Sequence, residues 1–251
     1  MEIIFITALG VGASTVFGAL LGFALGNPTH KVGDVILSFG GGVMLSASVL
    51  GLILPSLDYG GDWAIAVTAL GVMLGAALID LMDKLTPRLE GFILKDGTDD
   101  PDERKRRQRV LVFILAIAIH NIPEGIASGV AFGAGNTAEA MMVAISIALQ
   151  NVPEGMVIIS PMLSVGMSKK RALLYASITG LTEVLGTLFG YLTVSISKGL
   201  LPVFLAVAGG AMLYVISHEM IPETHSHGNE RGASYALLLG FIAMVAFGEL
   251  I

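Results

Sequence analysis

The sequence predicts an all-α fold: a polytopic membrane protein with eight transmembrane helices in a single domain over residues 1–251. Three features of the composition predict it. Charged residues make up 14% of the chain, compared with about 25% in a soluble domain. The mean hydropathy is +0.81, and glycine, which lets membrane helices pack closely, occurs 32 times. At roughly 20 residues for each span, the chain has no room for a sizeable soluble domain.

The composition also excludes several classes of function. The chain has no cysteine, so disulfides, thiolate chemistry, iron–sulfur ligation and metal sites with cysteine ligands are excluded. Its net charge of -6 provides no general basic surface, so nucleic acid is not expected as a partner. The expected partner is the lipid bilayer.

Eight apolar stretches follow one another along the chain, separated by turn-forming or charged sequences. The first begins at Met1-Glu2 without the basic segment of a signal peptide, so it is predicted to be a span rather than a cleaved leader. Turn sequences follow the first stretch at residues 27–28, the second at 58–61 and the fourth at 133–136. The stretches cover residues 3–25, 35–57, 64–85, 110–132, 140–162, 172–196, 200–221 and 233–250.

The longest connection, residues 88–109, holds the only dense cluster of charges in the sequence. It is predicted to be a charged, solvated cytoplasmic loop between spans three and four. With eight spans, all but one of the 14 Lys and Arg residues fall on one side of the membrane, and only Lys198 falls on the other. The positive-inside rule makes the first side cytoplasmic and places both termini outside. We therefore expect a multi-pass protein of the cell (inner or plasma) membrane.

Polar residues occur near the middle of spans four, five and six, where an ionised side chain costs about 2.5–3.5 kcal/mol. Spans four and five carry a repeat, Ala-Ile-His-Asn-Ile-Pro-Glu-Gly at residues 118–125 and Ala-Leu-Gln-Asn-Val-Pro-Glu-Gly at residues 148–155. Span six adds Glu183. Two similar motifs at one depth of antiparallel neighbours predict inverted repeats, with a site between them at the middle of the membrane.

The spacing within the repeat suits an ion. His120 and Glu124 are four residues apart, as are Gln150 and Glu154, so each pair shares one helix face and can chelate an ion. The asparagine of each motif points about 100° away and can reach a second ion. The proline of each motif leaves a carbonyl of the preceding turn without a donor, which a membrane tolerates only beside a polar cavity or an ion. The glycines let neighbouring backbones approach.

The three carboxylates, at Glu124, Glu154 and Glu183, would repel one another without buried Lys or Arg. They must be protonated, hydrated or neutralised by cations. One or two bound divalent metal ions would neutralise all three carboxylates at once. Oxygen ligands with one imidazole suit Zn²⁺, Fe²⁺ or Mn²⁺. The alternative is purely structural, with prolines that kink the helices and carboxyls that are neutral, hydrogen-bonded packing groups.

These motifs, together with Leu181-Thr182-Glu183 and residues 217–225, resemble the ZIP (Zrt/Irt-like) family of divalent-metal transporters, its shorter bacterial-type members in particular. The resemblance covers essentially the whole chain. It implies a 3+2+3 bundle with spans four and five at the centre, and it alone suggests a homodimer. It also implies a main metal site formed by His120, Glu124, Gln150 and Glu154, and a neighbouring one formed by Asn121, Asn151, Glu154 and Glu183.

The resemblance points to further residues with alternative roles. Met44 in span two resembles a position that contributes a thioether in some members, although a methionine in an apolar helix usually serves packing. His218 and Glu219, at the end of span seven, resemble residues thought to pass metal toward the cytoplasm; the alternative is a solvated helix end. Asp80 and Asp83 end span three near Lys84 and are expected to be interfacial.

The sequence therefore predicts a transporter that moves a divalent metal ion toward the cytoplasm through a site between spans four, five and six. Zinc is expected first, with iron, manganese or cadmium as alternatives, and the metal is a substrate, with no cofactor as catalyst. A passive metal channel with the same ligands is a second interpretation. A third is an intramembrane metal-dependent hydrolase, because His218-Glu219 begins a sequence like H-E-x-x-H. Pro222 stands where the second histidine would be, so an enzyme is not expected.

Overall fold

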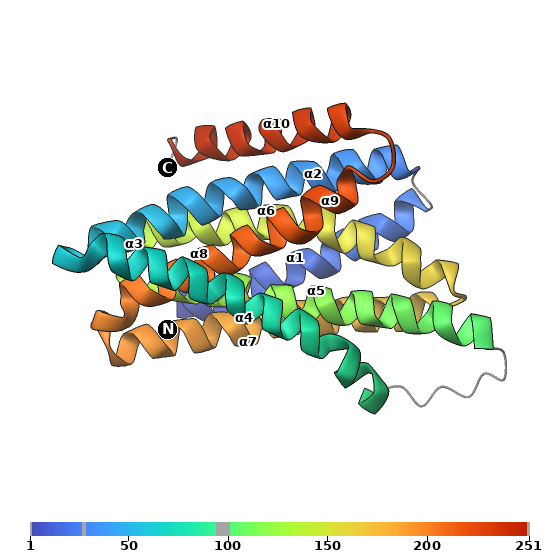
Figure 1. The fold of residues 1–251 in the computed structure, drawn as a ribbon, viewed down its shortest axis with the longest axis horizontal. Helices are drawn as coiled ribbons and strands as arrows, with labels where there is room; N and C mark the ends of the chain where they lie inside the picture. The colour runs from blue at the N-terminus through green and yellow to red at the C-terminus, as the bar shows by residue number, and fades with distance from the viewer. Residues whose placement is uncertain (1, 27–28, 94–100, 250–251) are drawn as a thin grey trace.

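The computed structural model describes residues 2–26, 29–93 and 101–249, and this part of the chain is almost entirely helical, without β-strands. Eight helical spans in it are long and apolar enough to cross a membrane. They run side by side in one bundle (Figure 1). The prediction of an all-α membrane protein with eight spans is confirmed.

The first span is a single helix, and the next two contain irregular turns. The first is α1 (Glu2–Leu25). The second begins as α2 (His30–Ser46), widens into the π-helical η1 (Ala47–Ile53) and ends as α3 (Leu54–Tyr59). The third consists of the 3-10 turn η2 (Gly61–Trp63) and α4 (Ala64–Ile93). Pro55, in the first turn of α3, has no N–H to donate, which suits the change from π-helix to α-helix.

The remaining spans repeat this combination of long and interrupted helices. Spans four, five, six and eight are α5 (Pro101–Ala134), α6 (Thr137–Ser164), α7 (Lys169–Ile196) and α10 (Glu230–Gly248). Span seven runs through η3 (Lys198–Leu200), α8 (Leu201–Val215), the π-helical η4 (Ile216–Met220) and α9 (Ile221–Thr224). The side chains of Asn136 and Ser168 accept hydrogen bonds from first-turn N–H groups and thereby begin α6 and α7.

The largest difference from the predicted elements concerns the charged connection at residues 88–109. α4 continues to Ile93 and α5 already begins at Pro101, so helix occupies both ends of the segment predicted as a loop. Residues 94–100, in its middle, lie outside the described residues. A charged sequence can still be helical, because the backbone groups of a helix bond to one another whatever the side chains contact.

The two ends of the bundle differ in charge. Both described chain ends lie at one end, which we call the far end (Figure 1). The opposite end is where α1, α4, α6 and α9 finish and where α2, α5, α7 and α10 begin. We call it the basic end, because it carries the basic residues that begin or end these helices. Among them are Lys31, Lys84, Lys169, Arg171 and Arg231.

The helices pack as two groups. In the first group α5 packs along α7, and α1 packs along both α6 and α7. In the second group α4 packs along α8, and α2 packs along α10. The groups meet mainly where α2 contacts α6 and α5 contacts α8. The motif-bearing α5 and α6 therefore lie in contact at the border between the groups, with three spans before them and three after them in the sequence.

Glycines set the close pairing inside each group. A side chain at Gly125 of α5 would collide with the backbone of Glu183 in α7, and one at Gly42 of α2 would collide with the backbone of α10. Such close backbone approach is a main source of helix association in lipid. Across the border the contact is looser, because Gly51 of η1 meets side chains of α6 and Gly40 of α2 has its nearest contacts with the side chain of Pro153. Each group is thus tightly built, and the two groups meet mainly through side chains.

These glycine contacts also reveal that the inverted repeat extends well beyond the two motifs. Two glycines one turn apart in α1 meet the backbone of α6, and two glycines in α7 meet the backbone of α5. They are Gly18 and Gly22 in α1 and Gly186 and Gly190 in α7. The same offset along the sequence relates Gly42 in α2, which meets α10, to Gly210 in α8, which meets α4. The first three spans and the last three are therefore two copies of one unit in opposite orientations.

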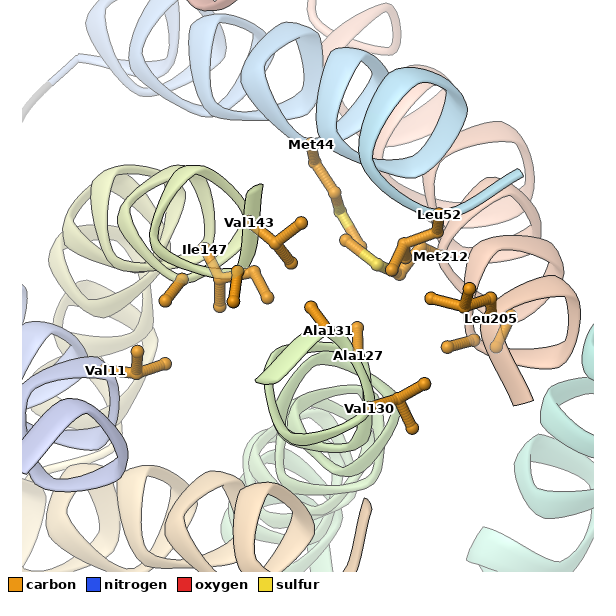
Figure 2. Close-up of a cluster of buried hydrophobic side chains, with 14 of the residues drawn as sticks. Val11, Met44, Leu52, Ala127, Val130, Ala131, Val143, Ile147, Leu205 and Met212 are labelled. Atoms are coloured by element: carbon orange, nitrogen blue, oxygen red, sulfur yellow. The ribbon is translucent and has the colours of Figure 1, made fainter. Parts of the chain in front are cut away.

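The far half of the bundle is filled by apolar side chains from both groups (Figure 2). We call this cluster the far-half core. Most of its side chains come from η1, α5, α6 and α8, with single residues from α1, α2, α4, α7 and η4, and they separate the motifs from the far end. They include Leu52, Ala127, Val143, Ile147, Leu205 and Met212, all of them buried.

Candidate metal centre

A cavity of about 590 Å³ occupies the basic half of the bundle. It lies on the border between the two groups, because α5 and α6 line it from one group and α2, α8, η4 and α9 line it from the other. Apolar side chains such as Phe113, Ile117 and Val157 form part of its wall. The polar residues that line it are His120, Glu124, Glu154, His218, Glu219 and Glu223.

The motifs on α5 and α6 form the inner end of this cavity, next to the far-half core. His120 and Glu124 lie one helical turn apart on α5 and are 5% and 1% exposed. Glu154 reaches the same cavity from α6. Pro123 and Pro153 lie inside their helices, so neither supplies an N–H to the carbonyl of the preceding turn. The sequence therefore places carboxylates and unbonded backbone acceptors at one depth.

Four other predicted ligands, Asn121, Gln150, Asn151 and Glu183, lie next to the cavity without lining it. Hydrogen bonds connect their side chains to one another or to the backbone of α7. The side-chain nitrogen of Gln150 donates to Asn151 Oδ1 at 2.9 Å, and Asn151 Nδ2 donates to Glu183 Oε1 at 2.5 Å. Asn121 Nδ2 donates to the carbonyl of Thr179 in α7 at 3.2 Å. Glu183 can approach this closely because Gly125 lets α7 lie against α5.

Several buried oxygens of this region have no hydrogen-bond partner among the described residues. They are Oδ1 of Asn121, Oε2 of Glu124, Oε1 of Glu154 and Oε2 of Glu183. The three carboxylates also lie near enough to interact with one another electrostatically. A buried charge without a partner costs several kcal/mol, so this arrangement is unfavourable by itself. It fits a divalent cation, which would supply the missing partner for these oxygens.

His120 also faces two acids that the sequence did not place beside it. Its Nε2 lies 2.8 Å from Oε1 of Glu219 and 3.5 Å from Oδ1 of Asp83, and the three ligand atoms lie within 4.8 Å of one another. Asp83, expected at the membrane interface, is instead half-buried beside His120. Asp80, one turn earlier on α4, pairs with Lys84 and accepts a hydrogen bond from Tyr214.

The remaining candidate ligands line the cavity with different exposure. Met44 is 1% exposed; it lines the cavity and also belongs to the far-half core, where it lies near Met212 (Figure 2). His218 and Glu219 sit on the π-helical η4 and also line the cavity. The ring of His218 lies against that of Tyr214, with centroids 5.0 Å apart. The structure thus brings His120, Glu124, Glu154, His218 and Glu219 to one cavity.

Known proteins resemble this chain over nearly its whole length. The family model described as ZIP Zinc transporter matches residues 93–248. The zinc transporter GufA of Myxococcus xanthus is 37% identical over 246 residues, which cover 94% of each chain. The zinc transporter ZIPB of Bordetella bronchiseptica is 40% identical over 248 residues, 93% of this chain and 76% of that one. The zinc transporter ZIP11 of Homo sapiens is 31% identical over 315 residues, with 92% of each chain covered.

Proposed function

The chain belongs to the ZIP family of zinc transporters, and on this basis we propose that it moves Zn²⁺ through the centre formed by His120, Glu124 and Glu154. Membership in the family supports transport of a divalent metal across a membrane. The observation that carries the site assignment is the pair of unpartnered carboxylate oxygens, on Glu124 and Glu154, at the inner end of a cavity. Fe²⁺, Mn²⁺ and Cd²⁺ are further candidate substrates, because oxygen ligands with one imidazole accept several divalent metals.

We propose that the ion moves toward the cytoplasm. The basic end carries nearly all of the Lys and Arg residues, so the positive-inside rule supports a cytoplasmic position for it. The cavity then faces the cytoplasm, and both termini face away from it. The protein would lie in the cell membrane, inner or plasma. A homodimer stays a prediction from the family resemblance.

Alternating access by movement of one helix group against the other is the mechanism that we favour. The inverted repeat supports it, because side chains that line the cavity have counterparts in the far-half core at the same offsets as the glycines and the motifs. Leu37 and Ile117 line the cavity, and their counterparts Leu205 and Ile147 are buried in the far-half core. A movement that exchanges these two environments would open the far end and close the basic end.

A second ion could bind beside the first, at Asn121, Asn151 and Glu183, with Glu154 shared between the two. The unpartnered oxygens of Asn121 and Glu183 support this part of the proposal. The amide of Asn151 presents its nitrogen to Glu183. A half-turn of that amide would present its oxygen instead, which is the orientation that a cation requires.

Uptake of metal by the purified protein in proteoliposomes tests the function. We expect saturable uptake of Zn²⁺, with Fe²⁺, Mn²⁺ and Cd²⁺ compared under the same conditions. A rate that rises without saturation would indicate a channel. No uptake of any of the four ions would contradict transport, and metal-dependent cleavage of lipid or peptide by the same preparation would favour the hydrolase.

Labelling of introduced cysteines tests the orientation and the location of the cavity. The chain has no cysteine, so the unchanged protein measures the background labelling. We expect Val157→Cys, in the cavity wall, to react with a membrane-impermeant maleimide from the cytoplasmic side and more slowly when Zn²⁺ is present. Ile147→Cys, in the far-half core, is the matched control and should stay unreactive toward reagent added on the cytoplasmic side. Reaction of Val157→Cys from the outside alone would reverse the assigned orientation.

A further inference from the structure

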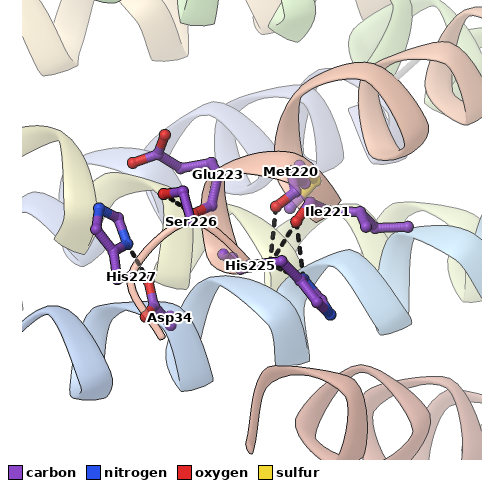
Figure 3. A network of polar contacts seen from close by, with 8 residues as sticks. Asp34, Met220, Ile221, Glu223, His225, Ser226 and His227 are labelled. Atoms are coloured by element: carbon purple, nitrogen blue, oxygen red, sulfur yellow. Dashed lines mark hydrogen bonds and ion pairs between the residues drawn. The ribbon is translucent and has the colours of Figure 1, made fainter. Parts of the chain in front are cut away.

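Three metal-ligating side chains gather at the basic end, apart from the candidate centre. His30 and Asp34 are four residues apart in the first turns of α2 and share one helix face. His227, in the connection between α9 and α10, reaches Asp34 (Figure 3). Its Nδ1 lies 3.0 Å from Oδ1 of Asp34, and its ring stacks on that of His30 with centroids 4.3 Å apart.

Asp34 is the unusual member of this cluster. It is 4% exposed, whereas both histidines are exposed, so the carboxylate lies at the base of a polar group that is open to solvent. Its Oδ2 is buried and has no hydrogen-bond partner among the described residues. A buried carboxylate costs several kcal/mol unless cationic partners and hydrogen bonds compensate for it. One imidazole on Oδ1 leaves the other oxygen uncompensated.

The chemistry of the three groups suits a transition-metal ion. Two imidazoles and a carboxylate form a common ligand set for Zn²⁺. The rings of His30 and His227 are stacked, and the lone pair of an imidazole nitrogen lies in the plane of its ring, so one ring must rotate out of the stack for both to bind one ion. A neutral imidazole has the free lone pair that a metal requires. A buried, partly unpartnered carboxylate beside such a ring is therefore prepared for a cation.

The inverted repeat carries different residues at the equivalent places. The offset that relates Gly42 to Gly210 also relates His30 to Lys198 and Asp34 to Pro202. Neither Lys198 nor Pro202 can bind a metal, although they occupy the equivalent places at the far end. The cluster is consequently a feature of the basic end alone, where the cavity is.

We propose that His30, Asp34 and His227 form a second binding site for a divalent transition-metal ion at the rim of the cavity. Two residues that line the cavity, Leu37 on α2 and Glu223 on α9, lie within four residues of Asp34 and His227, so the site borders the cavity mouth. It is loaded from the solution at the basic end. The inference does not depend on transport, since the site would bind metal in a protein that moves none.

Equilibrium dialysis of the full-length protein against Zn²⁺ tests this site. The background is the triple variant His120→Ala, Glu124→Ala and Glu154→Ala, which removes the candidate centre. We expect this variant to retain one tightly bound Zn²⁺, and we expect Asp34→Asn, added to it, to remove that ion. Asp34→Asn is nearly isosteric and keeps an oxygen toward His227, so its effect reports on charge and not on folding.

The matched control is His225→Ala in the same background. His225 belongs to the same connection but bonds to Ser234, with Nε2 3.0 Å from its Oγ, so we expect the bound Zn²⁺ to remain. Loss of Zn²⁺ with His225→Ala as well would show that this variant disturbs the connection, and Asp34→Asn would then decide. The proposal is wrong if the triple variant binds no Zn²⁺, or if it binds Zn²⁺ equally well after Asp34→Asn.

Discussion

Replacement of Glu124 or Glu154 by alanine is expected to abolish Zn²⁺ uptake into proteoliposomes. Each residue supplies a carboxylate at the inner end of the cavity, with one oxygen that has no partner in the described part of the chain. Loss of a group that only supports a ligand lowers metal affinity by about 10–100-fold, so loss of the ligand itself should exceed about 100-fold. Initial rates of ⁶⁵Zn²⁺ uptake measure the effect.

Two further variants test whether the effect comes from the charge at the centre, and not from the size of the side chain or from loss of any acidic residue. Glu154→Gln keeps the size of the side chain and removes its charge, and it should be nearly as inactive as Glu154→Ala. Glu139→Ala changes an exposed acid in the first turn of the same helix and should transport normally. Near-normal uptake by both alanine variants of the centre, at equal protein in the membrane, would contradict the site assignment.

The substitution Gly125→Ala is expected to destabilise the whole bundle. A Cβ at this position would collide with the backbone of Glu183, and a backbone cannot rotate away as a flexible side chain can. Overpacking of an ordinary core costs about 1–3 kcal/mol; here α5 and α7 must separate along their length, so we expect at least that cost. Thermal unfolding of the purified protein in detergent should show a clearly lower Tm.

The inverted repeat provides a second variant of the same kind, and an exposed glycine provides the control. Gly155→Ala should have a similar effect, because its Cβ would collide with the backbone of Thr15 in α1. Gly10, also in α1, has open space where a Cβ would stand, so Gly10→Ala should leave the Tm unchanged or raise it slightly, since alanine favours helix. Equal melting of Gly125→Ala and Gly10→Ala would show that the close pairing does not limit stability.

The sequence predicted those parts of the structure that depend on single helices. The eight spans follow from the length and hydropathy of each stretch, and the chelating pairs follow from the 3.6-residue period that puts His120 and Glu124 on one face. Helix pairing was not predicted, because it depends on which glycines meet which backbones. Its signal was nevertheless present: Gly18 and Gly22 have the same spacing as Gly186 and Gly190, and the offset between these pairs is the one that relates Gly42 to Gly210.

The acids beside His120 could not be predicted for a related reason. Asp83 stands near the end of an apolar stretch, where solvent exposure is the ordinary expectation. Its inward position depends on how α4 crosses the bundle, and that crossing is set by the packing of α4 on α8. Likewise, Glu219 reaches His120 from η4, and a regular helical period does not place residues correctly after a π-helical turn.

The position of the cavity in the basic half, with the far-half core beyond it, has an electrical consequence. With the orientation proposed above, water in the cavity would carry the potential of the cytoplasmic solution inward to Glu124 and Glu154, so most of the membrane voltage would fall across the far-half core. A voltage of 100 mV is worth about 2.3 kcal/mol for each elementary charge that crosses it, hence about twice that for a divalent ion. The negative-inside potential of a living cell would then draw the metal across the far-half core and would oppose its return from the centre to the outside.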